Sequence, residues 1–87
     1  MNVHIEYCVK WNYGPEFDRV SKIILSINSN VDVRGNSNPP RTGSFEVSID
    51  GKLVFSKLNS NLFPNSDEIY SWFEWILCKL SYIKFEF

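Results

Sequence analysis

The sequence has few of the residues that build metal or disulfide sites. Its 87 residues include two cysteines, Cys8 and Cys78, and a single histidine, His4. A structural zinc site takes four Cys or His ligands, so no metal site is expected. Two cysteines far apart in the chain do not make a disulfide framework. We therefore expect free thiols and a reducing, cytoplasmic location.

The sequence also lacks runs of like charge and long apolar segments. Nine Lys and Arg residues against ten Asp and Glu residues leave a net charge of −1. No basic run of five or more residues is present, so nucleic acid is not an expected partner. No apolar stretch reaches the roughly 18 residues that span a bilayer. The first residues show no signal-peptide pattern, and the last residues contain no cysteine for prenylation.

Apolar and aromatic residues, in contrast, are plentiful. Hydrophobic residues make up 44% of the chain and aromatic residues 16%, which is enough for a core without metal or disulfide support. The length suits one domain and not two. We expect a single domain over residues 1–87, in which residues 81–87 are either an added strand or a disordered tail.

Hydrophobic periodicity predicts the order strand, helix, three strands, helix. Apolar residues alternate with polar ones in the strand segments and recur at helical spacing in the helix segments. Asn65, followed three residues later by Glu68, marks the start of the second helix. The predicted strands are residues 3–8, 31–34, 44–49 and 52–57, and the predicted helices are residues 15–28 and 65–80.

The last two strands form a hairpin around Asp-Gly, and its register has two solutions. A two-residue turn pairs Ile49 with Lys52, whereas a three-residue loop or a bulge pairs Ile49 with Leu53. We favour the second solution, with Val47 opposite Phe55. A slip by one residue would turn polar side chains of the second strand into the core.

Most of the predicted strands alternate instead of being apolar throughout. A sheet covered on both faces would not show this alternation, so both helices are expected on one face. The prediction is an α/β (α+β) fold of two layers in the order βαβββα, with a four-stranded mixed sheet and a right-handed crossover.

Cys8 is the leading candidate for chemistry. It ends the first strand one short loop before a helix, and the helix N-terminus and Lys10 would both favour a thiolate. The alternative is an inert, buried cysteine, but Cys8 falls on the polar side of its strand. His4 is roughly 13 Å away along an extended strand, too far for a Cys–His dyad. Cys78 is expected on the outer face of the second helix, without a function.

Several short motifs resemble those of the selenoprotein W family, also called the Rdx family. The similarity covers about residues 3–80 and includes a Tyr-Cys pair at a strand end. The stretch of residues 53–58, with Phe63-Pro64 after it, is especially similar to the migration and invasion enhancer branch. The matching motifs are Ile5-Glu6-Tyr7-Cys8, Tyr13-x-Pro15, Thr42-Gly43-x-Phe45-Glu46-Val47 and Asp50-Gly51-Lys52-Leu53-Val54.

The resemblance implies a thioredoxin-like fold and a role in cell redox homeostasis, with Cys8 as the redox thiol. It implies no bound cofactor, and it suggests glutathione as co-substrate and a 14-3-3-type adaptor as a protein partner. Pro39 either lies near the active thiol, as a proline does in many family members, or only stiffens its loop. The residues expected near the thiol are Lys10, Tyr13, Pro39, Thr42 and Gly43.

Members of the family that this sequence resembles carry a Cys-x-x-Cys or Cys-x-x-selenocysteine motif after the first strand. Here Cys8 occupies the first position of that motif, and Trp11 stands at the second. A dithiol cycle within this loop is therefore impossible. Three accounts follow. The protein works as a monothiol through Cys8; or it has lost catalysis and is an interaction module in which Trp11 and Tyr13 form a contact surface; or Trp11 is a misread selenocysteine codon, because UGA differs by one base from the tryptophan codon.

Overall fold

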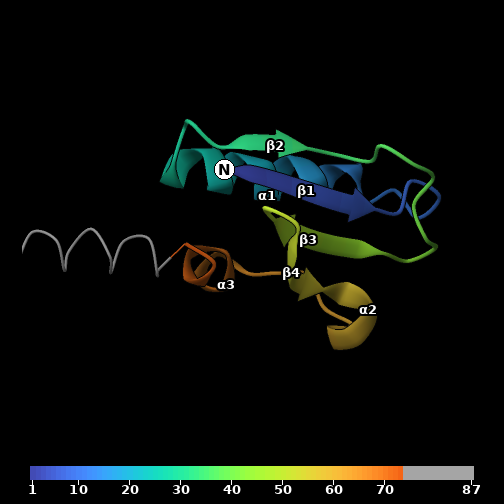
Figure 1. Ribbon diagram of the computed structural model, residues 1–87. Coiled ribbons are helices and arrows are strands. Elements are labelled where there is room, and N and C mark those ends of the chain that lie inside the picture. The colour runs from blue at the N-terminus through green and yellow to red at the C-terminus, as the bar shows by residue number, and fades with distance from the viewer. Residues whose placement is uncertain (74–87) are drawn as a thin grey trace, which may run out of the picture.

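The computed structural model describes residues 1–73 and shows a four-stranded sheet with its two longer helices packed on one face (Figure 1). The strand order is β2-β1-β3-β4, in which β2 is parallel to β1 and the other neighbours are antiparallel. The elements are β1 (Asn2–Tyr7), α1 (Gly14–Ile27), β2 (Asp32–Arg34), β3 (Phe45–Ile49), β4 (Lys52–Ser56), α2 (Lys57–Ser60) and α3 (Ser66–Ser71).

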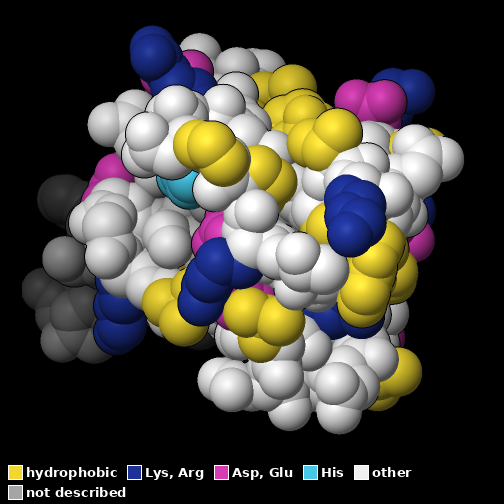
Figure 2. All heavy atoms as spheres, turned by 90° about the vertical axis from the view of Figure 1, so that its right-hand side faces the viewer, with side chains coloured by type: hydrophobic (Ala, Val, Ile, Leu, Met, Phe, Trp, Pro, Cys, Tyr) yellow, Lys and Arg dark blue, Asp and Glu magenta, His cyan; other side chains and the backbone are white. Residues whose placement is uncertain are grey.

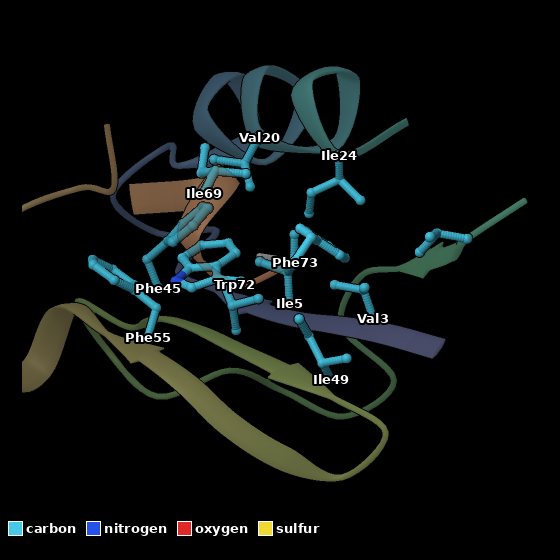
Figure 3. Packing of buried hydrophobic residues seen from close by; sticks show 12 residues of the cluster. Val3, Ile5, Val20, Ile24, Phe45, Ile49, Phe55, Ile69, Trp72 and Phe73 are labelled. Carbon is cyan, nitrogen blue, oxygen red and sulfur yellow. The ribbon is translucent and has the colours of Figure 1, made fainter. Parts of the chain in front are cut away.

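The core lies between the sheet and the two longer helices. Figure 3 shows Val20 and Ile24 of α1 pointing toward the strands, with Ile69 of α3 beside them. The strand side chains that meet them, such as Ile5, alternate along the chain with polar ones, as a half-covered sheet requires. The predicted one-sided arrangement of the helices is therefore confirmed.

The predicted helix boundaries hold at the starts. Pro15 lies in the first turn of α1, where its missing N–H costs no hydrogen bond. Asn65 caps α3, because its side-chain oxygen accepts a hydrogen bond of 2.8 Å from the Glu68 N–H. The predicted course of the second helix beyond residue 73, the position of Cys78 and the tail of residues 81–87 lie outside the described residues.

The hairpin register differs from the favoured prediction. Ile49 faces Lys52 across the two-residue Asp50-Gly51 turn, and Val47 faces Phe55 as predicted. Both pairs exist because the ladder shifts after Val47, so that β4 carries one extra residue in a β-bulge. The predicted Ile49–Leu53 pair is wrong: Leu53 lies opposite Ser48 and is 54% exposed.

The short helix α2 was not expected from the sequence. It follows β4 directly, and the Ser56 hydroxyl caps it by accepting a hydrogen bond of 3.2 Å from the Asn59 N–H. Asn61 ends it in the left-handed conformation, with φ of 62°. A helix of four residues has no apolar periodicity, so hydrophobic patterning does not detect it.

Candidate functional site

Cys8 is the first residue after β1 and extends the pairing of β1 with β3. Its N–H donates to the Ser44 carbonyl at 2.9 Å, and its own carbonyl accepts from the Tyr13 N–H at 3.0 Å. The cysteine is free, and only 2% of its surface is exposed. The position of Cys8 on the polar side of the strand pattern predicts an accessible thiol. This prediction is wrong, because the residue is buried.

A tight turn connects Cys8 to α1. The Asn12 N–H donates to the Val9 carbonyl at 3.0 Å, and Asn12 has a φ of 59°. Asn tolerates this left-handed conformation better than most residues do. The turn places Lys10 and Trp11 at its tip, where both are exposed, and Trp11 has 54% of its surface in solvent.

Gly43 supports the ring of Trp11. A Cβ atom at Gly43 would lie 2.7 Å from the Trp11 ring, closer than real Cβ contacts come. Gly43 also has a φ of +76°, which favours glycine on conformational grounds. The next residue, Ser44, is the backbone partner of Cys8. The loop therefore contacts the two residues before β3 at two points, Cys8 and Trp11.

An aromatic ridge, defined here as Trp11, Tyr13 and Phe63, leads from the turn to the segment after α2. Trp11 meets Tyr13 edge-on at 6.2 Å between ring centroids, and Tyr13 meets Phe63 edge-on at 4.8 Å. The Lys57 Nζ atom lies 5.3 Å from the Tyr13 centroid and 5.2 Å from that of Phe63. Such cation–π contacts fix a lysine over the rings while its charge stays available.

Ionic contacts on the helix-free face tie the loop between β2 and β3 to the sheet. The Arg41 Nη2 atom lies 2.9 Å from Glu6 and 3.7 Å from Glu46. Hydrogen bonds from Arg41 hold the pKa of Glu6 below its ordinary value, against a smaller opposing effect of burial. Glu46 is buried and accepts hydrogen bonds from the Ser56 hydroxyl and the Lys57 N–H. This carboxylate thereby fixes the start of α2.

The structure brings together most of the residues predicted near the thiol. Tyr13 and Gly43 contact Trp11, Lys10 is at the tip of the turn, and Thr42 is exposed beside Gly43. Pro39 is exposed and lines a separate hollow of about 220 Å³ on the helix-free face, together with His4 and Glu6.

Sequence analysis missed Lys57 and Phe63, because they reach the site from a segment more than forty positions away in the chain. The signal that could have found them is in the resemblance itself, which includes residues 53–58 and Phe63-Pro64. Within residues 1–73, no group of three or more His, Cys, Asp or Glu side chains is placed to hold a metal ion. The helices in this part of the chain are too short and too polar to cross a membrane.

Comparisons with known proteins show the family of the chain. A model of the Rdx family matches residues 2–72. The chain belongs to the Rdx family. Selenoprotein W of Danio rerio is 35% identical over 68 residues, which cover 77% of this chain and 79% of that protein.

Solved structures match the Rdx fold described above. A protein of Bordetella parapertussis has a TM-score of 0.67 at 18% identity, covering 78% of this chain and 86% of that one. A selenoprotein W-related protein from Vibrio cholerae has a TM-score of 0.65 at 21% identity, covering 78% and 85%. The thioredoxin-like fold is thereby confirmed.

In the loop after β1, Cys8 and Trp11 differ in their exposure to solvent. Position 8 carries a thiol and is buried, whereas position 11 is exposed and carries an indole ring. A thiol reacts with a disulfide only when its sulfur can be reached. Exchange at Cys8 therefore requires the residues around the buried thiol to move.

Proposed function

We propose that this Rdx protein has a thiol-redox role in which Cys8 acts as a monothiol. The position of Cys8 supports the proposal: it is a free thiol directly after β1, covered at the start of a short turn that leads into α1. Two backbone hydrogen bonds close the turn, and its local opening is the step that we propose exposes Cys8.

The proposed chemistry uses glutathione as co-substrate and needs no second thiol. The Cys8 thiolate attacks one sulfur of glutathione disulfide, forms a mixed disulfide with that half and releases the other half as glutathione thiolate. A glutathione thiolate then attacks the glutathione sulfur of the mixed disulfide, which regenerates Cys8 and glutathione disulfide. Replacing glutathione by a protein thiol in the first disulfide gives the corresponding exchange with a partner, for which the family resemblance suggests a 14-3-3-type adaptor.

Glutathionylation of Cys8 tests the proposal. The Cys78→Ser variant is incubated with glutathione disulfide, and the modified peptide is located by mass spectrometry, with Cys8→Ser/Cys78→Ser as control. We expect a mixed disulfide on Cys8 that reduced glutathione reverses. A Cys8 thiol that stays unmodified in the folded protein, but reacts after unfolding in urea, would contradict the monothiol role.

The codon for residue 11 is a separate test of the loop. A TGA codon would place a selenocysteine at the exposed tip, with Cys8 as the covered partner of a selenol–thiol pair. A TGG codon makes Trp11 native and leaves Cys8 as the thiol of the loop.

A second candidate function is a non-enzymatic interaction module. The exposure of Trp11, at 54% of its surface, favours it, because a large aromatic side chain held in place at a surface is typical of binding sites. The two functions respond differently to Cys8→Ser, which removes thiol exchange and leaves binding through Trp11 intact.

A further inference from the structure

The aromatic ridge gives the interaction function a definite partner chemistry. Its three rings are in edge-on contact, and Trp11 rests on Gly43, so the ridge is ordered before any partner binds. A surface that is ordered in advance loses little side-chain entropy on binding. Exposed apolar residues lie near it in the sequence: Val9, 63% exposed, two positions before Trp11, and Leu58 and Leu62, 43% and 70% exposed, next to Lys57 and Phe63.

The charge at this surface is positive and uncompensated. Lys10 projects from the turn, and the Lys57 ammonium lies over the rings of Tyr13 and Phe63. Among residues 1–73, neither ammonium has a carboxylate within ion-pair distance, whereas Arg19 and Arg34 each have one and Arg41 has two. Figure 2 shows this end of the molecule, with Lys and Arg side chains standing between groups of hydrophobic ones.

We propose that the aromatic ridge, together with Lys10 and Lys57, binds an acidic segment of a partner protein that carries apolar side chains between its carboxylates. The apolar side chains would pack on Trp11 and the neighbouring apolar residues, and the carboxylates would pair with the two lysines. Charge complementarity favours this occupant, because the Lys57 ammonium lies over the rings of the aromatic ridge and neither it nor Lys10 has a carboxylate partner among residues 1–73. The inference rests on the interaction function and not on the thiol.

Three synthetic peptides test the partner chemistry with the full chain under reducing conditions. One alternates glutamate with leucine, the second replaces glutamate by lysine, and the third replaces leucine by serine. Fluorescence anisotropy of the labelled peptides measures affinity. We expect the glutamate–leucine peptide to bind at least about tenfold more tightly than either of the others, and to weaken as salt is raised. Equal binding of the acidic and basic peptides would overturn the proposal.

Matched variants locate the binding surface. Trp11→Ala should weaken binding of the acidic peptide at least about tenfold, as truncation of a central aromatic contact does. Lys57→Gln should weaken it less and reduce its salt dependence. Leu53→Ala is the control for Trp11→Ala, since Leu53 is also 54% exposed but lies on β4. Lys52→Gln, at the start of β4, is the control for Lys57→Gln. Controls that weaken binding as much as the ridge variants would place the site elsewhere.

Two further outcomes separate the proposals. Cys8→Ser should leave peptide binding unchanged within about twofold; it abolishes glutathionylation, so failure of one function does not imply failure of the other. Sedimentation velocity should show a monomer at the concentrations used. A dimer that Trp11→Ala dissociates would overturn the acidic-partner proposal and assign the surface to a second copy of the chain.

Discussion

Cys8 and Trp11 lie three residues apart in one turn, and their surroundings are opposite. The thiol is 2% exposed and the indole is 54% exposed. The reactive group of the loop is therefore buried, and its large aromatic side chain is at the surface. The difference teaches that one loop can hold a reactive group in the interior and a contact residue at the surface. We propose that the turn that presents Trp11 is also the part that opens when Cys8 reacts.

Trp11→Cys would abolish the contrast and should have the largest effect. In a Cys78→Ser background it creates a Cys-x-x-Cys loop with one covered and one exposed thiol, which allows an intramolecular disulfide. We expect most molecules to lose both free thiols under mild oxidation, counted by alkylation and mass spectrometry. Trp11→Ser is the control and should keep Cys8 reduced or singly glutathionylated. Two thiols that both stay free in the cysteine variant would show that the turn holds them apart.

Gly43→Ala would displace the indole while leaving the thiol in place. We expect a loss of about 2–4 kcal/mol in the free energy of unfolding, because the positive φ costs about 1–2 kcal/mol and the overlap with Trp11 adds about 1–2 kcal/mol. Gly51→Ala is the matched control: its φ is +84° but nothing lies within 4 Å of the added Cβ. Urea denaturation measures both variants.

A double variant isolates the ring contact. In a Trp11→Ala background, the cost of Gly43→Ala should fall to that of Gly51→Ala, because only the conformational part remains. A cost that is the same with and without the indole would show that the ring does not rest on Gly43.

Glu46→Gln would weaken the start of α2, from which Lys57 reaches the aromatic ridge. The carboxylate is 6% exposed and accepts hydrogen bonds from the Ser56 hydroxyl and the Lys57 N–H. Loss of its charge should reduce the free energy of unfolding by about 1–3 kcal/mol, measured by urea denaturation. Asp18→Asn, at an exposed position of α1, should change it by less than about 0.5 kcal/mol. If both variants change the free energy of unfolding equally, the Glu46 carboxylate does not stabilise the start of α2.

The smallest effect expected is a pH dependence carried by Glu6. Its pKa is lowered in the folded state from the ordinary value of 4.5, chiefly by hydrogen bonds from Arg41. Its contribution to stability is therefore complete above that value and is lost as the pH falls through the folded-state pKa. Thermal unfolding should show wild type more stable than Glu6→Gln at pH 7, with a difference that shrinks below pH of about 4.5. A difference in stability that grows on acidification would show that folding raises the pKa of Glu6 instead of lowering it.

The sequence predicts the framework of the molecule because its strands and first helix have regular hydrophobic periods. It does not predict where the bulge in β4 lies. The pairs Ile49–Lys52 and Val47–Phe55 belong to different regular registers, and both form only because β4 has one extra residue between them. It also does not predict the short helix α2, whose start depends on Glu46 from a different strand.

The candidate site could be located but not described from sequence. The motif and the strand end identify Cys8, and the glycine at position 43 is part of the resemblance. Alternation places Cys8 on the polar, helix-free face, yet at this end of the sheet that face is not open: Ser44 and Glu46 on it are also buried. Cys8 is bonded there to Ser44, 36 positions away in the chain, and a local pattern carries no information about such contacts.

The accessibility of Cys8 tests the account most directly. The rate of Cys8 alkylation is measured in a Cys78→Ser background, in the folded protein and in urea, with and without the further change Trp11→Ala. The account predicts slow alkylation in the folded protein. It also predicts an increase of roughly two- to tenfold for Trp11→Ala, as expected when an aromatic contact worth about 0.5–1.5 kcal/mol no longer holds the turn closed. A folded Cys8 that reacts as fast as in urea, or a rate indifferent to Trp11, would contradict it.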